Sequence, residues 1–204
     1  MSFAQLGLLG DEEPTFESGF SGVRRIALGA DAWLDHLPGW VRGHERLFEV
    51  LRASTRWRDE QRPMYGRVID VPRLTANVPE DGPGHPVIDA MRGALSLRYG
   101  EAFERIGLSL YRDGNDSVAW HGDRIARKMP EAMVATISLG APRRFMLRPA
   151  AGGQSLSMAL GWGDLLVMGG SCQRTWQHCV PKVPKASPRI AIMLRPRWND
   201  QAYY

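Results

Sequence analysis

The chain has 204 residues, of which 44% are hydrophobic and 24% are charged, and its formal net charge is +4 at pH 7. This length can bury one sizeable core and nothing in the composition marks a second one, so we expect a single domain over residues 1–204. The sequence contains no apolar run near the roughly 20 residues of a membrane span. We therefore expect no membrane segment.

The cell compartment and the class of partner follow from similar arguments. Acidic residues 11–13 stand where a secretion signal would have its cleavage site. Cys172 and Cys179 are too few for a disulfide framework, and a pair of reduced thiols is the simpler expectation. These features favour a cytoplasmic protein. A pI near 9.4 allows an anionic partner such as nucleic acid without requiring one.

The first part of the chain gives weak patterns. Residues 1–20 mix Gly, Pro, Ser and acidic residues without periodicity, so we expect a tail or a loose arm there. RRIALGA at 24–30 predicts a short strand, and a helix is predicted to start at Asp31 and to be interrupted at Pro38. Residues 44–52 place their large apolar side chains on one face, which predicts a second helix.

The segment 62–86 differs in kind from what precedes it. Its aromatic residue, Tyr65, stands among arginines that include Arg67 and Arg73, and the step from Tyr65 to Gly66 suits a hairpin turn. An exposed ring can stack on a base while guanidinium groups contact phosphate. Composition alone favours an ordinary solvated hairpin over a nucleic-acid contact, and both interpretations stay open at this point.

After a helix predicted over residues 86–97, the pattern changes to short apolar runs broken by Gly and Pro. Each run has the length of a sheet strand. They read IGLSLYR, MVATISLG, RFMLRP, SLSMALG, DLLVMGG and RIAIMLR. Short turns between them indicate an antiparallel sandwich or barrel, so the predicted fold class is mainly β with flanking helices, with a jelly-roll barrel over residues 103–197.

A metal site is indicated by the pair His121 and Asp123 in the run WHGD. Residues two apart in a strand point to the same face, so both side chains can reach one ion. Among the other histidines, His178 alone lies in the same strand-rich half. Two histidines and one carboxylate are the ligands of non-haem Fe(II) oxygenases. Chance alone would place an Asp two residues after one of the five histidines about a quarter of the time, so the pair by itself is weak.

An anion site is indicated by the last apolar run. Arg189 and Arg195 lie six residues apart in it, which puts both on one face of a regular strand. Guanidinium groups that project into a barrel are costly without an anion, because they cannot shed their proton. An anionic cofactor would meet this need. Tyr111 supplies a hydroxyl group on the approach to His121.

Together these segments resemble the AlkB family of Fe(II)- and 2-oxoglutarate-dependent dioxygenases. The resemblance covers residues 105–197 and lies in the runs LSLYRDGNDSVAWHGD, ISLGAPRRFMLR, GDLLVMGG, WQHCVPK and SPRIAIMLR. In addition, PMYGRVIDVPRLT resembles the family's nucleotide-recognition hairpin. The family fold is a double-stranded β-helix, or jelly roll, with an N-terminal helical and hairpin extension.

The resemblance assigns roles by position. His121, Asp123 and His178 match the iron ligands. Tyr111, Ser109, Arg189 and Arg195 match the residues that bind 2-oxoglutarate, with Arg189 on its distal carboxylate. On the hairpin, Tyr65 and Gly66 match a finger that enters the base stack, while Arg67 and Arg73 would lie on the nucleic-acid side. The implied cofactors are Fe(II), 2-oxoglutarate and O2, and the implied partner of a monomeric enzyme is methylated DNA or RNA.

The implied reaction is oxidative demethylation of N-alkylated bases, of the DNA repair type, with release of formaldehyde, succinate and carbon dioxide. The target base would be flipped out of a duplex or taken from a single strand. Two alternatives remain open at this stage. The same class of oxygenase could act on a protein side chain or a small metabolite, or the chain could be a non-catalytic nucleic-acid-binding module.

Four departures from the family pattern bear on the substrate. Ser109 and Ala191 stand where relatives often have asparagine, and Arg124 follows the metal-site aspartate where repair enzymes often continue with acidic residues. After PRLTAN, moreover, the chain shows no aromatic residue of the kind that often sandwiches the flipped base. The cofactor assignment is therefore more specific than the choice of lesion.

Overall fold

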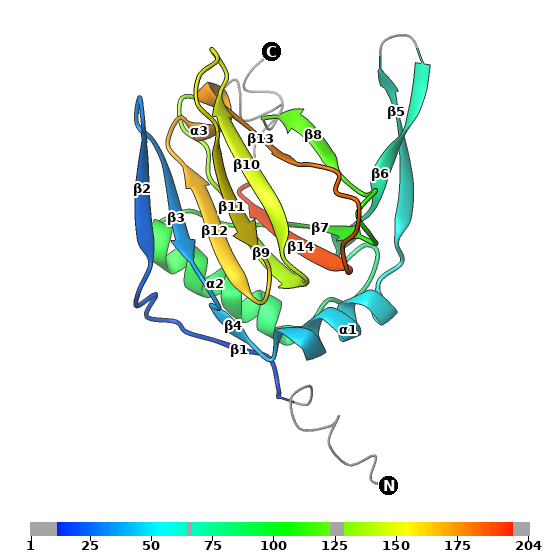
Figure 1. Ribbon diagram of the computed structural model, residues 1–204. Helices are drawn as coiled ribbons and strands as arrows, with labels where there is room; N and C mark the ends of the chain where they lie inside the picture. The colour runs from blue at the N-terminus through cyan, green and yellow to red at the C-terminus, as the bar shows by residue number, and fades with distance from the viewer. Residues whose placement is uncertain (1–11, 65–66, 123–128, 198–204) are drawn as a thin grey trace, which may run out of the picture.

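A computed structural model describes residues 12–64, 67–122 and 129–197, with the backbone alone over 61–64 and 67–70. Two antiparallel sheets face each other (Figure 1). The larger sheet has eight strands in the spatial order β2 (Arg24–Gly29), β3 (Ala32–Leu37), β12 (Asp164–Gly169), β9 (Val134–Gly140), β14 (Arg189–Arg195), β7 (Arg105–Tyr111), β6 (Arg67–Val78) and β5 (Arg58–Met64). The smaller sheet has the order β11 (Leu156–Leu160), β10 (Arg143–Pro149), β13 (Trp176–Val180) and β8 (Val118–His121).

This arrangement confirms the predicted class, mainly β with flanking helices. All six apolar runs predicted as strands after residue 103 form strands, namely β7, β9, β10, β11, β12 and β14. Among the described strands, no hydrogen-bonded ladder joins the two sheets, so they lie face to face without closing into one continuous barrel.

The described residues form three helices beside the sheets: α1 (His44–Ser54), α2 (Pro86–Tyr99) and the short α3 (Cys172–Thr175). Both longer helices were predicted, and the start of α2 has a physical cause. His85 is its N-cap, and the Nδ1 atom of His85 accepts a hydrogen bond of 3.2 Å from the backbone N–H of Val87. None of the described helices is both long and apolar enough to cross a membrane.

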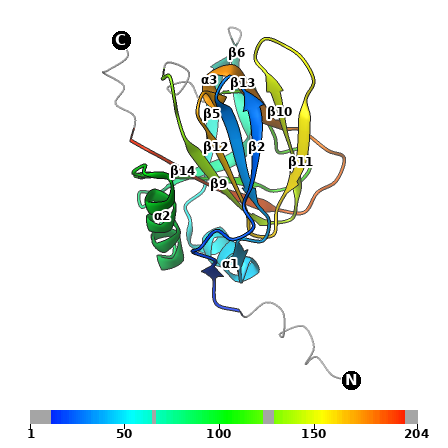
Figure 2. The ribbon, with the colours of Figure 1, turned by 90° about the vertical axis from the view of Figure 1, so that its left-hand side faces the viewer.

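A hydrophobic core fills the space between the helices and the outer face of the large sheet. Figure 2 shows α2 on the far side of this sheet from β10 and β11. Leu47 and Leu51 of α1 and Met91 and Leu95 of α2 are buried in this core, with Ile192 of β14 among the strand residues that face them. Burial of such side chains contributes on the order of 2 kcal/mol each.

A second, smaller core lies between the two sheets, and it includes Leu34, Phe145, Leu147 and Leu166. The strands of the large sheet therefore have apolar side chains on both faces. The inner face also carries polar side chains, among them Ser109, Thr136 and Arg189, so the inner core is incomplete and a cavity remains beside it.

The helix predicted from Asp31 is wrong, because residues 32–37 form strand β3. Ala30 and Asp31 have φ angles of 49° and 62°, which is the left-handed conformation that a two-residue hairpin turn requires. Asp31 is thus a turn residue between β2 and β3 and not a helix cap. Strand β3 is buried on both faces, Leu34 in the inner core and Leu37 in the outer one, so its sequence lacks the alternation of an exposed strand.

The expected N-terminal arm also differs from the structure over its described part. The short strand β1 (Thr15–Phe16) pairs with β4 (Val41–Arg42), and Phe20 is buried. The rings of Phe16 and Phe20 lie 5.1 and 5.4 Å from the ring of Trp40, measured between centroids. These aromatic contacts fasten the segment to the outer core.

The predicted hairpin is present: β5 and β6 pair antiparallel from Arg58↔Thr75 to Met64↔Arg67. It extends beyond the body of the molecule at the side of the small sheet's edge strand β8 (Figure 1). Its base is fixed by Asp81, a buried carboxylate that accepts hydrogen bonds from the guanidinium groups of Arg56 and Arg58.

Candidate active site

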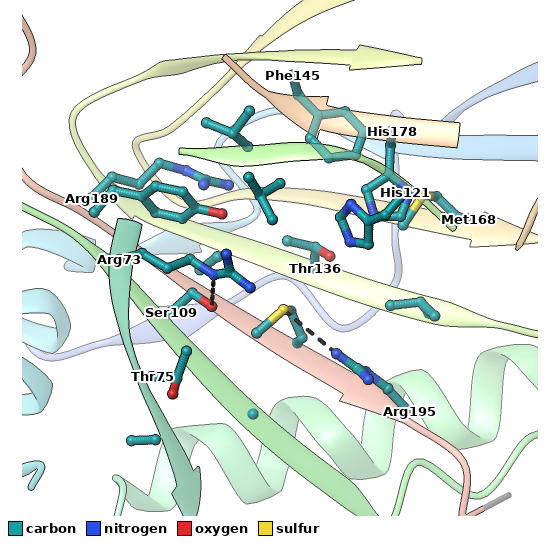
Figure 3. Close-up of a pocket in the computed structure, with 18 of the residues that line it drawn as sticks. Arg73, Thr75, Ser109, His121, Thr136, Phe145, Met168, His178, Arg189 and Arg195 are labelled. Atoms are coloured by element: carbon teal, nitrogen blue, oxygen red, sulfur yellow. Dashed lines mark hydrogen bonds between the residues drawn. The ribbon is translucent and has the colours of Figure 1, made fainter. Parts of the chain in front are cut away.

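A cavity of about 240 Å³ lies between the two sheets. Its floor is the inner face of the large sheet, and its roof comes from the small sheet. The lining residues with roles in the argument come from seven elements: Arg73 and Thr75 of β6, Ser109 and Tyr111 of β7, His121 of β8, Thr136 of β9, Phe145 of β10, His178 of β13, and Arg189 and Arg195 of β14 (Figure 3).

The hollow in the floor has a simple origin in sequence. Ser109 pairs across the sheet with Ala191, and Gly107 pairs with Met193. Three of these four positions carry small side chains or none, and all four line the cavity. Larger residues at the same positions would fill the space, as Leu34 and Leu166 do farther along the sheet.

His121 and His178 lie side by side on neighbouring strands of the roof. They are direct cross-strand partners, with ring centroids 4.3 Å apart and ring planes inclined by 54°. Two imidazoles bound at right angles to one ion at a metal–nitrogen distance of about 2.1 Å would have centroids about 4.5 Å apart. The two predicted ligands therefore already have a spacing that fits a shared metal ion.

The surroundings of both rings favour metal binding. The Nδ1 atom of His121 lies 2.9 Å from the carbonyl oxygen of Ala119. Because a carbonyl can only accept, Nδ1 carries the proton and Nε2 carries the lone pair that a metal needs. Burial is the main cause that lowers the pKa of His178 well below its ordinary value, and the neighbouring His121 ring and the Arg195 guanidinium act in the same direction. A neutral imidazole is the form that binds a metal.

Asp123, the third predicted ligand, lies outside the described residues. Strand β8 ends at His121, so the structure places two of the three predicted ligands together and leaves the third a prediction.

Arg189 occupies the other end of the cavity and is 2% exposed. Its Nη2 donates a hydrogen bond of 2.7 Å to the Ser138 hydroxyl group, while Nε and Nη1 have no hydrogen-bond partner among the described residues. Burial lowers the pKa of Arg189, but a guanidinium group keeps its proton. A buried cation with two unsatisfied donors fits a carboxylate that binds to both, as the sequence predicts for 2-oxoglutarate.

The remaining predicted cofactor residues line the same cavity. Tyr111 is the cross-strand partner of Arg189, and the Arg189 guanidinium carbon lies 5.2 Å from the centre of its ring. Ser109 is buried on the floor. Arg195 lies on the same face of β14 as Arg189, as the six-residue spacing predicts, and its Nη2 contacts the sulfur of Met193 at 3.8 Å.

The predicted nucleic-acid residues are distributed differently. Tyr65 and Gly66 lie outside the described residues, and only the backbone of Arg67 is described. Arg73, for which a position on the nucleic-acid side was predicted, lines the cavity (Figure 3), and its predicted contact with nucleic acid stays a prediction. Its Nε donates to the Ser109 hydroxyl group over 3.4 Å, and its Nη1 donates to the carbonyl oxygen of Ser117 over 3.4 Å.

Several cavity residues were not identified from the sequence. Ser138 orients Arg189, Thr136 adds a hydroxyl group to the floor, and Phe145 stacks on His178 with centroids 5.4 Å apart. A signal for the first two exists in the run VATISLG, where Thr136 and Ser138 are the polar members of a period-two pattern. Phe145 reads as an ordinary core residue in the sequence.

Arg143 is a further residue that the sequence does not single out. It is 3% exposed, and its two terminal nitrogens donate to the carbonyl oxygens of Asp113, Asp116 and Pro181 over 2.8–2.9 Å. Asp113 and Asp116 precede β8, and Pro181 follows β13. Arg143 therefore ties together the segments that carry the two histidine-bearing strands.

Replacing Arg143 by methionine is expected to lower the free energy of unfolding by about 3 kcal/mol, because several buried carbonyl groups lose their donor. Urea unfolding followed by circular dichroism measures this change. Arg144→Met is the matched control, since Arg144 is exposed and adjacent in the same strand, and it should unfold like the wild type. Equal stabilities of the two variants would show that the Arg143 contacts add nothing to the fold.

Comparison with known proteins agrees with this geometry. Residues 98–199 match the model of the 2OG-Fe(II) oxygenase superfamily. The chain is 29% identical over 216 residues to alpha-ketoglutarate-dependent dioxygenase alkB homolog 3 of Homo sapiens, covering 93% of this chain and 73% of that protein. It is 31% identical over 193 residues to DNA oxidative demethylase ALKBH2 of Arabidopsis thaliana, covering 73% and 60%.

A structural comparison gives the same fold. The solved structure of OsALKBH1 superposes with a TM-score of 0.56 and 14% sequence identity, covering 85% of this chain and 100% of that one. At this identity the likeness speaks for the fold alone. The family model, in contrast, matches half of the chain, including the segments that carry the histidine pair and the buried arginine. The chain therefore belongs to the 2OG-Fe(II) oxygenase superfamily, as an AlkB-like dioxygenase that uses Fe(II), 2-oxoglutarate and O2.

Proposed function

We propose that this dioxygenase removes methyl groups oxidatively from N-alkylated bases in nucleic acid. The observation that carries the proposal is the cavity itself: a pair of histidines with metal spacing and a buried arginine with unsatisfied donors share one space beside a projecting hairpin. Relatives that carry the names alkB homolog 3 and DNA oxidative demethylase support the choice of substrate.

In this proposal His121, Asp123 and His178 hold Fe(II), and Arg189 binds the distal carboxylate of 2-oxoglutarate beside Tyr111. Bound Fe(II), with 2-oxoglutarate and O2, supplies the oxidation of a methyl C–H bond, with succinate and carbon dioxide as products. The hydroxylated methyl group leaves its nitrogen as formaldehyde. Two histidines and one carboxylate leave three positions on an octahedral ion for these reactants.

The protein itself contributes by positioning the side chains that bind the cofactors and by enclosing the space between them. Ser138 holds Arg189 in place, and Phe145 stacks on His178 and restricts its orientation. The histidines and the arginine line one space between the two facing sheets, so the sheets cover this space from two sides. A base in a duplex cannot enter such a space, so it must be flipped out or presented in a single strand.

The decisive experiment offers methylated DNA and RNA oligonucleotides to the enzyme with iron, ascorbate and 2-oxoglutarate. Loss of one CH2 unit from an oligonucleotide, detected by mass spectrometry and accompanied by formaldehyde, is the expected result. A reaction without 2-oxoglutarate is the control. If 2-oxoglutarate is converted to succinate while every oligonucleotide keeps its mass, the substrate belongs to the other class considered above, a protein side chain or a metabolite.

The hairpin provides a second test of the substrate. Tyr65→Ala is expected to reduce turnover of duplex substrates several-fold more than turnover of single strands, because a single strand needs no residue to fill the stack of a flipped base. Initial rates on matched duplex and single-stranded oligonucleotides measure the ratio. Equal losses on both substrates would contradict a role for Tyr65 as a finger.

A further inference from the structure

Arg73 belongs to hairpin strand β6, yet its side chain turns into the cavity that holds the site (Figure 3). We infer that Arg73 is a binding residue for 2-oxoglutarate, acting with Arg189, and not a contact for the nucleic-acid backbone. The inference deepens the proposed function and rests on it. It concerns a residue of this chain and the cofactor that the superfamily uses.

The first argument is the position of Arg73 in the sheet. The register of β6 against β7 pairs Leu74 with Leu110 and thereby sets Arg73 beside Tyr111, which is itself the partner of Arg189. The three side chains thus form one row across three adjacent strands. Neighbouring strands lie about 4.8 Å apart, so the backbones of the two arginines are roughly 10 Å apart. Both long side chains can reach the same ligand above the tyrosine.

The second argument is the depth of the floor. Ser109 and Ala191 lie on the floor beside this row, and their short side chains leave space above them. Arg73 leans over this space, with its Nε 3.4 Å from the Ser109 hydroxyl group. The side chains of Ser109 and Ala191 are too short to reach a ligand held above the floor. Such a ligand would therefore contact the Arg73 guanidinium.

The third argument is charge. Arg73, Arg189 and Arg195 all line one cavity of about 240 Å³. Guanidinium groups keep their protons, so these three cations outnumber Glu60, the one carboxylate that lines the cavity among the described residues. A dicarboxylate brings two negative charges, and planar carboxylates match the forked donors of arginine. A nucleic-acid phosphate would have to enter the cavity to make the same contact.

The test measures cofactor binding without turnover. Calorimetry of 2-oxoglutarate binding to the full chain loaded with Mn(II) compares the wild type with Arg73→Met and Arg73→Lys. We expect the methionine variant to lose tenfold or more in affinity, in line with the strength of a hydrogen bond to a charged group. The lysine variant should recover part of this loss, because it keeps the charge but not the fork.

Arg144→Met is the matched control, since Arg144 is an exposed arginine that does not line the cavity. It should bind 2-oxoglutarate like the wild type. Affinity for a methylated single-stranded oligonucleotide, measured over a range of salt concentrations, should keep its salt dependence in Arg73→Met. The inference would be overturned if Arg73→Met bound 2-oxoglutarate as tightly as the wild type does. It would also be overturned if the salt dependence of oligonucleotide affinity fell in Arg73→Met by the amount expected for one phosphate contact.

The experiment distinguishes a loss of 2-oxoglutarate binding from misfolding of a variant, and it distinguishes failure of the Arg73 inference from failure of the proposed substrate. Circular dichroism of each variant shows whether the overall fold is kept, and the lysine variant preserves the cation if methionine disturbs β6. If the wild type binds 2-oxoglutarate but demethylates no oligonucleotide, the proposed substrate is wrong while the comparison of Arg73 variants remains decisive.

Discussion

Replacing His178 by alanine is expected to reduce formaldehyde release more than a hundredfold. Loss of a residue that merely orients a metal ligand typically costs 10–100-fold, and loss of a ligand itself should exceed this range. His178 is the partner of His121 across the sheet, and the two rings have the spacing of a shared ion. The affinity of the same variant for Mn(II) should also fall at least a hundredfold. Electron paramagnetic resonance, which detects free Mn(II), measures this affinity.

Two further variants make this result specific. His121→Ala should give a similar loss, because His121 is the direct cross-strand partner of His178. His85→Asn removes a histidine outside the cavity and replaces it with a residue that also caps helices, so its metal affinity should be that of the wild type. Undiminished turnover in both alanine variants would remove this histidine pair from the reaction.

Replacing Arg189 by lysine is expected to raise the concentration of 2-oxoglutarate needed for half-maximal rate more than tenfold. Lysine keeps a positive charge but cannot donate from two fixed positions to one carboxylate. Arg189→Met should go further and abolish the stabilisation of the protein by 2-oxoglutarate. For the wild type this stabilisation is about 2.7 kcal/mol at a ligand concentration one hundred times Kd. Thermal unfolding of the Mn(II) form with and without 2-oxoglutarate measures it.

The same variants have an opposite effect on the protein without cofactor. Arg189 is a buried cation with two donors that lack partners in the described structure, which is a cost to the folded state. Methionine has a similar length and no charge, so Arg189→Met should be at least as stable as the wild type when 2-oxoglutarate is absent. A marked loss of stability there would mean that Arg189 serves the fold and not the ligand.

The sequence predicts the sheets well because most of their strands are apolar runs of limited length that end at Gly or Pro. It fails at β3, where both faces are buried and Asp31 imitates a helix cap. The failure is physical: a strand that contributes Leu34 to one core and Leu37 to another has no polar face to reveal its period.

The candidate site was predictable where it depends on strand geometry. The six-residue spacing of Arg189 and Arg195 gives a shared face without knowledge of any neighbour, and the structure agrees. The inward turn of Arg73 was not predictable, because it depends on which face of β6 joins the floor and hence on pairing with β7. Ser138 and Arg143 depend likewise on contacts far apart in the sequence.

The position of β14 has a consequence for how the protein is made. This strand lies between β9 and β7, and it follows every other described strand in the chain. Until it is synthesised and inserted, β2, β3, β12 and β9 form one group and β7, β6 and β5 form another, each with an open edge where β14 will go. A nascent or truncated chain that stops before Arg189 would expose both edges and be prone to aggregate. The strand that completes the sheet is also the one that carries Arg189 and Arg195 of the cavity.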